Sequence, residues 1–146
     1  MNYHHSFTVN ATLQDVRNFH ARSASMGAIT PPPVIVRVHS APEELGDGDT
    51  MDFTMWMGPL PVRWVAQIEA VTATSFVDRM IKGPFRKWVH RHSFVALAPN
   101  QTEVQDSLEI ELSDNPFWRA VGSFMWLNLP VLFTFRKFKT RWLLQS

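Results

Sequence analysis

Apolar and polar residues alternate along most of the chain between residues 34 and 112. Alternation with a period of two is typical of strands that bury one face and expose the other. Glycine, proline and asparagine interrupt the pattern at several points, where turns are expected. We therefore predict a first strand at residues 3–9 and a meander of later strands at residues 34–39, 51–57, 62–70, 76–80, 88–96 and 102–112.

A helical period follows the first strand. Thr12 and Asp15 have the spacing of a helix N-cap and its partner. We expect a helix at residues 12–22 and a short second helical turn at residues 24–29. The prolines at positions 31–33 end any helix and force an extended chain.

The helical period returns near the C-terminus. From residue 115 onward, apolar residues recur at three- or four-residue intervals. They are Phe117, Val121, Phe124, Leu127, Val131, Phe135, Phe138 and Trp142. We expect Ser113 or Asp114 to cap this long helix, Pro130 to kink it, and its apolar stripe to lie against the sheet.

Together these elements predict an α+β helix-grip fold. A curved antiparallel sheet of about seven strands would wrap around the long C-terminal helix, with one or two short helices after the first strand. Residues 1–146 are expected to form a single domain. A curved sheet that holds a helix leaves a space between them, and a ligand cavity is expected there.

Composition narrows the possible partners. The 146 residues include no cysteine, which excludes disulfides and thiolate metal sites and is compatible with a cytoplasmic location. A formal charge of +1 argues against nucleic acid as a partner. The longest uncharged run, residues 120–135, is too short for stable membrane insertion. As for oligomeric state, we expect a monomer or weak homodimer. The basic residues Arg136, Lys137, Lys139 and Arg141 are interpreted as a solvated helix face.

Several short motifs resemble a known group of proteins. They are Thr30-Pro31-Pro32, Gly58-Pro59, Arg63-Trp64, Phe76-Val77-Asp78, Gly83-Pro84-Phe85, Trp88-x-His90-x-His92-x-Phe94 and Asp106. This set resembles bacterial proteins of the SRPBCC superfamily, the START-like or Bet v 1-like group that includes polyketide cyclase/dehydrase-type proteins. The resemblance implies the helix-grip fold and a deep hydrophobic cavity. It leaves the activity open, because the superfamily holds lipid carriers, hormone binders, cyclases and oxygenase domains.

The pair His90-x-His92 carries the clearest candidate chemistry. Residues two apart on a strand point to the same face, so both imidazoles should face the cavity. A three-residue loop at residues 99–101 would place Asp106 opposite Phe94 and diagonal to His92. A tight turn near Gly83 would place Asp78 opposite His90 or His92. His90, His92, Asp106 and Asp78 are therefore the candidate catalytic residues.

Three interpretations of this polar group remain open. It could be a buried hydrogen-bonded network, a polar anchor for a ligand, or a catalytic or metal-binding set. Two imidazoles without a third are a weak metal signal, so we predict neither a metal nor a cofactor. His4 and His5 are interpreted as surface residues.

The leading functional hypothesis is binding of a hydrophobic small molecule, such as a lipid, an isoprenoid or a polyketide-like compound. Methionines at 51, 55 and 57 favour a tolerant pocket. The candidate ligand-binding residues are Met55, Met57, Trp64, Phe76, Asp78, Met80, Trp88, His90, His92, Phe94, Asp106, Phe124, Leu127, Val131 and Phe135. The alternatives are a cyclase/dehydratase-type enzyme that uses the His/Asp group as general acid and base, and a protein- or membrane-interaction module.

Overall fold

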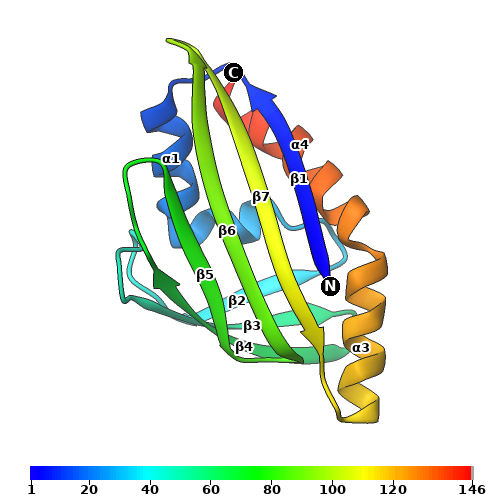
Figure 1. Ribbon diagram of the computed structural model, residues 1–146. Helices are drawn as coiled ribbons and strands as arrows, with labels where there is room; N and C mark the ends of the chain where they lie inside the picture. The colour runs from blue at the N-terminus through cyan, green and yellow to red at the C-terminus, as the bar shows by residue number, and fades with distance from the viewer. Residues whose placement is uncertain (146) are drawn as a thin grey trace.

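The computed structural model describes residues 1–145, within which a seven-stranded antiparallel sheet is joined by four helices (Figure 1). The strands are β1 (Asn2–Val9), β2 (Ile35–Ser40), β3 (Thr50–Met57), β4 (Leu60–Glu69), β5 (Ser75–Lys82), β6 (Phe85–Ala98) and β7 (Gln101–Leu112). The helices are α1 (Leu13–Ala21), α2 (Ser23–Ala28), α3 (Pro116–Leu127) and α4 (Leu129–Leu144). The strand order is β1-β7-β6-β5-β4-β3-β2, which confirms the predicted helix-grip fold.

Even-numbered side chains of the long strands point toward the helices, as the alternation predicts. Trp64 on β4 is 4% exposed, Trp88 on β6 is 8% exposed, and Leu108 on β7 is 1% exposed. These side chains pack in one core with Leu129 and Phe133 of α4. The hydrophobic core therefore lies between the sheet and α4, and the inner sheet face also carries the candidate polar residues.

Side chains that cap the helices define where they begin. Thr12 accepts a hydrogen bond from the backbone N–H of Asp15 at 3.1 Å, which confirms the predicted N-cap of α1. At α3 the N-cap is Asn115, whose side-chain oxygen accepts hydrogen bonds from the next turn. The prediction of Ser113 or Asp114 is therefore wrong by one or two residues. Asparagine is as favourable at the N-cap position as serine or aspartate, so residue type alone did not distinguish the three positions.

The pairing of β6 with β7 differs from the prediction by two residues. Asp106 lies directly opposite His92, whereas Phe94 pairs with Val104. The register shifts between Ala96 and Ala98 at a β-bulge near the hairpin loop. Ala98 pairs with Gln101, so the loop is one residue shorter than predicted, and the bulge adds one residue to β6 only. Together the shorter loop and the bulge account for the difference of two.

The C-terminal segment forms two helices instead of one kinked helix. α3 ends at Leu127 and α4 begins at Leu129, with Asn128 between them. The side-chain amide of Asn128 donates a hydrogen bond to the carbonyl of Phe124 at 2.8 Å. Pro130 lies in the first turn of α4, where its missing N–H is no loss. The prediction of one helix kinked at Pro130 is therefore wrong, because the chain breaks into two helices at Asn128, two residues before Pro130.

The predicted apolar stripe of the C-terminal helix faces outward, contrary to the prediction. Leu127 is 75% exposed, Phe138 is 59% exposed and Trp142 is 66% exposed. The residues that pack toward the sheet include Met125, Trp126, Leu129, Leu132 and Phe133. Both sides of this segment are apolar, so periodicity alone did not identify the buried side. Within residues 1–145, no helix has the length and apolar character required to cross a bilayer.

Gly122 explains why α3 turns this side toward the sheet. A Cβ atom at this position would lie 3.1 Å from both Leu112 Cδ2 and Phe85 Cε1. Such a distance is tighter than ordinary packing, so any larger residue would force the neighbouring side chains to move. The absence of a side chain at Gly122 lets α3 approach the ends of β6 and β7 closely.

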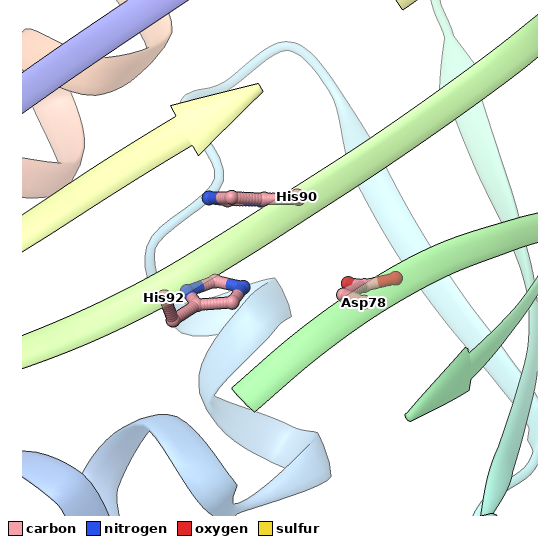
Figure 2. Close-up of side chains that lie close together, drawn as sticks. All are labelled: Asp78, His90 and His92. Carbon is pink, nitrogen blue, oxygen red and sulfur yellow. The ribbon is translucent and has the colours of Figure 1, made fainter. Parts of the chain in front are cut away.

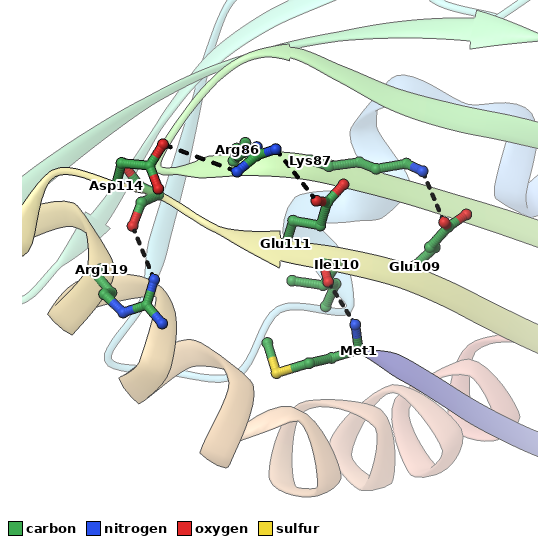
Figure 3. A network of polar contacts seen from close by, with 9 residues as sticks. Met1, Arg86, Lys87, Glu109, Ile110, Glu111, Asp114 and Arg119 are labelled. Atoms are coloured by element: carbon green, nitrogen blue, oxygen red, sulfur yellow. Dashed lines mark hydrogen bonds and ion pairs between the residues drawn. The ribbon is translucent and has the colours of Figure 1, made fainter.

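Ion pairs cover the outer face of β6 and β7 (Figure 3). Lys87 Nζ lies 2.7 Å from Glu109 Oε1, and Arg86 lies 3.9 Å from both Glu111 and Asp114. These side chains are largely exposed, and exposed pairs contribute little to stability. Their position confirms that the odd-numbered acidic residues of β7 face solvent, which leaves the even-numbered residues for the interior.

Candidate ligand-binding site

Two histidines and an aspartate from β5 and β6 meet on the inner face of the sheet (Figure 2). Asp78 pairs directly with His90, one of the two predicted alternatives. His92 follows on the same face, and its ring stacks on that of His90 with a centroid distance of 3.8 Å. Each of the three residues offers one ligand atom, and these atoms lie within 4.8 Å of one another. The structure therefore brings the three residues together.

Asp106 on β7 holds His90 in place. Its Oδ1 accepts a hydrogen bond of 2.8 Å from Nε2 of His90, and both side chains are buried. Burial alone would raise the pKa of Asp106, but the hydrogen bond from His90 and the charges of His90, His20 and Arg136 lower it below its ordinary value. Asp106 is therefore ionised at neutral pH and orients the imidazole of His90.

Burial shifts the pKa values of His92 and Asp78 in opposite directions. Desolvation holds the pKa of His92 well below its ordinary value, and the charges of His90, His20 and Arg136 lower it further. Desolvation raises the pKa of Asp78, with His90 and Arg136 opposing the shift. Nδ1 of His92 and Oδ1 of Asp78 are buried, and neither has a hydrogen-bond partner within residues 1–145. Buried polar atoms normally have partners, so Oδ1 of Asp78 is available to a ligand, whereas Nδ1 of His92 also lies 3.4 Å from Oδ1 of Asp106.

Arg136 of α4 belongs to the site, although the sequence analysis placed it on a solvated helix face. The side chain lines the cavity beside Asp78, His90 and His92. Its Nε atom is buried and lacks a hydrogen-bond partner in the described part of the chain. The interpretation as a solvated face is wrong for this residue because Arg136 lies one turn after the partly buried Leu132 and the buried Phe133. The sequence did contain a signal for this position: two inward-facing aspartates on the sheet predict a basic residue on the helix that covers them.

His20 and His5 also lie near the polar group. His20 of α1 is fixed by a 2.8 Å hydrogen bond between its Nδ1 and the carbonyl of Val16, and its ring lies 6.1 Å from that of His92. Burial lowers the pKa of His20. His5 was predicted to be a surface residue, but its ring packs against Phe133 at 5.4 Å. The error has a simple cause: odd-numbered side chains of β1 face the core, so only one of the adjacent histidines at 4 and 5 is exposed.

An inner cavity of about 110 Å³ surrounds the polar residues. It lies between the sheet and helices α1, α2 and α4. The predicted residues that line it are Met55, Trp64, Phe76, Asp78, Trp88, His90 and His92. Apart from the polar group, its walls are mainly aliphatic, aromatic and methionine side chains. The inner cavity is therefore an apolar space with a few convergent polar atoms, the usual composition of a ligand site.

A larger outer pocket of about 640 Å³ adjoins the inner cavity. It lies between the proline segment at residues 31–33, strands β3 and β4, and the junction of α3 with α4. The predicted residues that line it are Met55, Met57, Trp88, Phe124 and Val131. Four side chains line both spaces, namely Met55, Trp88, Met125 and Leu132. The two spaces therefore share a wall that includes two flexible methionines.

Five predicted ligand-binding residues line neither space. Met80 and Phe94 pack in the hydrophobic core, and Asp106 lies behind His90. Leu127 faces solvent, because it belongs to the outward side of α3. Phe135 also lines neither space, because the helix turns Leu132 and Arg136 inward instead.

The arrangement can perform two kinds of chemistry besides simple packing. A neutral imidazole at His92 can accept a proton, which is the requirement for a general base at neutral pH. Asp78, His90 and His92 also form a set of two imidazoles and one carboxylate, a combination that can hold a divalent metal ion. Arg136 lines the same cavity, and its positive charge opposes a second cation there.

The sequence matches no family model and no curated protein, whereas the fold matches many solved structures. A protein of Chromobacterium violaceum aligns with a TM-score of 0.77 over 100% of this chain and 99% of its own, at 7% identity. A START superfamily protein of Mycobacterium smegmatis gives 0.61 over 90% of this chain and 93% of its own, at 11% identity. An aromatase/cyclase of Streptomyces sp. R1128 gives 0.64 over 80% and 71%, at 16% identity.

These similarities define the structural class. The chain has the helix-grip fold that START superfamily proteins and aromatase/cyclases share. This confirms, at the level of the fold, the resemblance carried by the motifs between Gly58 and Asp106. At identities this low only the fold is shared, so any assignment of function depends on the residues of the site itself.

Proposed function

We propose that the chain binds a hydrophobic small molecule with a polar end, such as a lipid, an isoprenoid or a polyketide-like compound. The apolar part would occupy the outer pocket, whose volume of about 640 Å³ suits a ligand of this size. The polar end would lie in the inner cavity. The observation that supports this proposal most directly is the set of buried, unpartnered polar atoms beside an apolar pocket, counted over residues 1–145.

The polar atoms favour a ligand end that accepts hydrogen bonds. Arg136 offers a buried Nε–H, and Asp78, whose pKa is raised by burial, can donate a hydrogen bond in its protonated form. A carbonyl or carboxylate oxygen would accept from both. Hydrogen bonds to a charged group contribute roughly 1.5–3 kcal/mol, so Arg136 would contribute about one to two orders of magnitude in affinity.

A matched pair of ligands tests this proposal. Oleate and oleyl alcohol share one chain and differ only in the end group, and calorimetry would give their affinities for the purified protein. We expect Arg136→Met to weaken oleate binding at least about tenfold and to affect the alcohol less. Lys137→Met removes the neighbouring charge and should change neither affinity. Equal affinities of the unmodified protein and Arg136→Met for oleate would contradict the assigned role of Arg136.

Filling the outer pocket tests the other half of the proposal. Ala120 lines this pocket and is exposed, so Ala120→Trp can place an indole there without disturbing the core. We expect loss of binding of both ligands and loss of any lipid that native mass spectrometry detects in the purified protein. Ala24→Trp, at an exposed helical position that lines neither space, is the control. Full binding by Ala120→Trp would exclude the outer pocket as the ligand site.

The hydrogen-bonded pair of His90 and Asp106 favours one further candidate function, a cyclase-type enzyme. The imidazole of His92 would take a proton from a carbon next to a ligand carbonyl. The resulting enolate oxygen would be stabilised by Arg136, and Asp106 would keep His90 oriented beside it. Deuterium exchange at the central carbon of an aromatic 1,3-diketone, followed by NMR in heavy water, measures this step. We expect exchange above the buffer rate that His92→Gln abolishes and His4→Gln retains.

A further inference from the structure

The outward side of α3 and α4 carries a row of large apolar side chains that no part of the described chain covers. We call this row the outer stripe, and it consists of Phe117, Phe124, Leu127, Val131, Phe138 and Trp142. Each of these residues is between 54% and 75% exposed. Their spacing places them on one side of the two successive helices, which follow each other along one side of the molecule (Figure 1). An exposed apolar surface of this kind is typical of an interaction site.

The charges beside the outer stripe have a single sign. Residues 115–146 contain five basic residues and no acidic residue. Lys137 Nζ lies 5.1 Å from the ring centroid of Phe138, and Lys139 Nζ lies 4.2 Å from that of Trp142. Neither lysine forms an ion pair with any of residues 1–145. Exposed aromatic rings and free lysines therefore occupy the same surface.

We propose that the outer stripe docks the chain on the surface of a membrane that contains anionic lipids. Helices α3 and α4 would lie in the plane of the interface, with the rings of the stripe among the lipid chains and Lys137 and Lys139 at the phosphate level. Helices of this composition bind membranes through buried apolar area and through attraction to anionic lipids. The two helices are too short to span the bilayer, so the contact is peripheral and reversible.

Charge favours a lipid surface over a second copy of this chain. A symmetric dimer through the outer stripe would bring together two segments whose only charged side chains are basic, and no acidic side chain within residues 115–146 could pair with Lys137 or Lys139. An anionic lipid surface supplies the missing negative charge. Phe124 and Val131 also line the outer pocket, so docking would place that pocket against the bilayer.

Co-sedimentation with vesicles tests the proposal. One set of vesicles contains phosphatidylcholine alone, and the other contains phosphatidylcholine mixed with phosphatidylserine. We expect binding to the mixed vesicles that weakens as salt increases. Phe138→Gln with Trp142→Gln should lower binding by a factor of about ten or more, and Lys137→Glu with Lys139→Glu should lower it by about fivefold or more for each lysine. Phe138 and Trp142 are exposed, and neither lysine forms an ion pair within residues 1–145, so circular dichroism should show an unchanged fold.

The controls remove comparable groups elsewhere on the surface. Ile35→Gln with Ile81→Gln removes exposed apolar side chains from the sheet, and Arg37→Glu reverses an exposed charge on β2. Both should bind the mixed vesicles as the unmodified protein does. Absence of binding to mixed vesicles at low salt overturns the proposal, as does equal binding by the stripe variants. A concentration-dependent dimer that the stripe variants abolish, without vesicle binding, would assign the stripe to a second copy instead.

Discussion

The depressed pKa of His92 makes the stability of the protein depend on pH in a predictable direction. The folded chain keeps His92 neutral because its side chain is desolvated and lies near His90, His20 and Arg136. The unfolded chain protonates the same imidazole at an ordinary pKa. Below about pH 6.5 the unfolded state therefore binds one more proton than the folded state, and acid favours unfolding. The stability linked to His92 is complete above this pH and is lost as the pH falls.

The size of the effect follows from proton linkage. One proton of difference changes the free energy of unfolding by about 1.4 kcal/mol for each pH unit. Between about pH 7.5 and pH 5.5, His92 therefore contributes a loss of about 1.4 kcal/mol. The loss corresponds to one pH unit, because the unfolded chain binds the extra proton only below about pH 6.5. His20, whose pKa is also lowered by burial, adds a loss in the same direction.

Urea denaturation at the two pH values measures this difference, with the fluorescence of the six tryptophans as the signal. The His92→Gln variant keeps a polar side chain but cannot titrate. We expect it to lose about 1.4 kcal/mol less than the unmodified protein over this pH range, whatever its stability at neutral pH. His4→Gln, which removes an exposed histidine of β1, should leave the pH dependence unchanged. An unchanged pH dependence in His92→Gln would refute the assignment of a buried, neutral imidazole.

Three further substitutions test the packing. Phe133→Ala should lower the free energy of unfolding, measured with urea, by about 3–5 kcal/mol, because Phe133 is 1% exposed. Phe138 is 59% exposed, so Phe138→Ala should change the free energy of unfolding by no more than about 0.5 kcal/mol. Equal losses in the two variants would contradict the orientation of α4. Asp78→Asn should raise stability by about 1 kcal/mol at neutral pH. The pKa of Asp78 is raised in the folded chain, so at a pH above its ordinary pKa the ionisation of this carboxyl favours the unfolded state. A lower melting temperature of the variant would indicate that Asp78 has a partner. Gly122→Val should lower stability by about 1–3 kcal/mol, and an unchanged melting temperature would argue against close contact of α3 with the sheet.

The sheet could be predicted from the sequence because a period of two permits only two answers for each strand. Trp64, Trp88 and Leu108 share one parity with most of their apolar neighbours, and the three glutamates of β7 have the other parity. Assigning the apolar set to the core therefore placed His90, His92 and Asp106 inside as well. That these side chains share one face of the sheet could therefore be predicted from their even position numbers alone.

The hairpin register could not be obtained in the same way. Alternation fixes which face a residue occupies, but it does not fix which residue lies opposite. Ala98 pairs with Gln101, so the loop is one residue shorter than predicted, and a bulge between Ala96 and Ala98 shifts the later pairs by one more. Nothing in this stretch of small and apolar residues marks either feature. Because a shift of two preserves parity, Asp106 remained on the inner face and moved from a diagonal position to one opposite His92. The error changed the contacts without changing the site.

The C-terminal helices were oriented incorrectly because two apolar sides compete there. One side carries the larger and more numerous aromatic residues, and hydrophobicity alone selects it. The other side carries Gly122 and Arg136, which a hydrophobic score penalises. Packing and charge place the second side against the sheet. Gly122 permits close approach to β6 and β7. The positive charge of Arg136 interacts favourably with the carboxyl groups of Asp106 and Asp78. The same choice exposes the outer stripe, so the polar anchor inside the cavity and the apolar surface outside it are two results of one helix orientation.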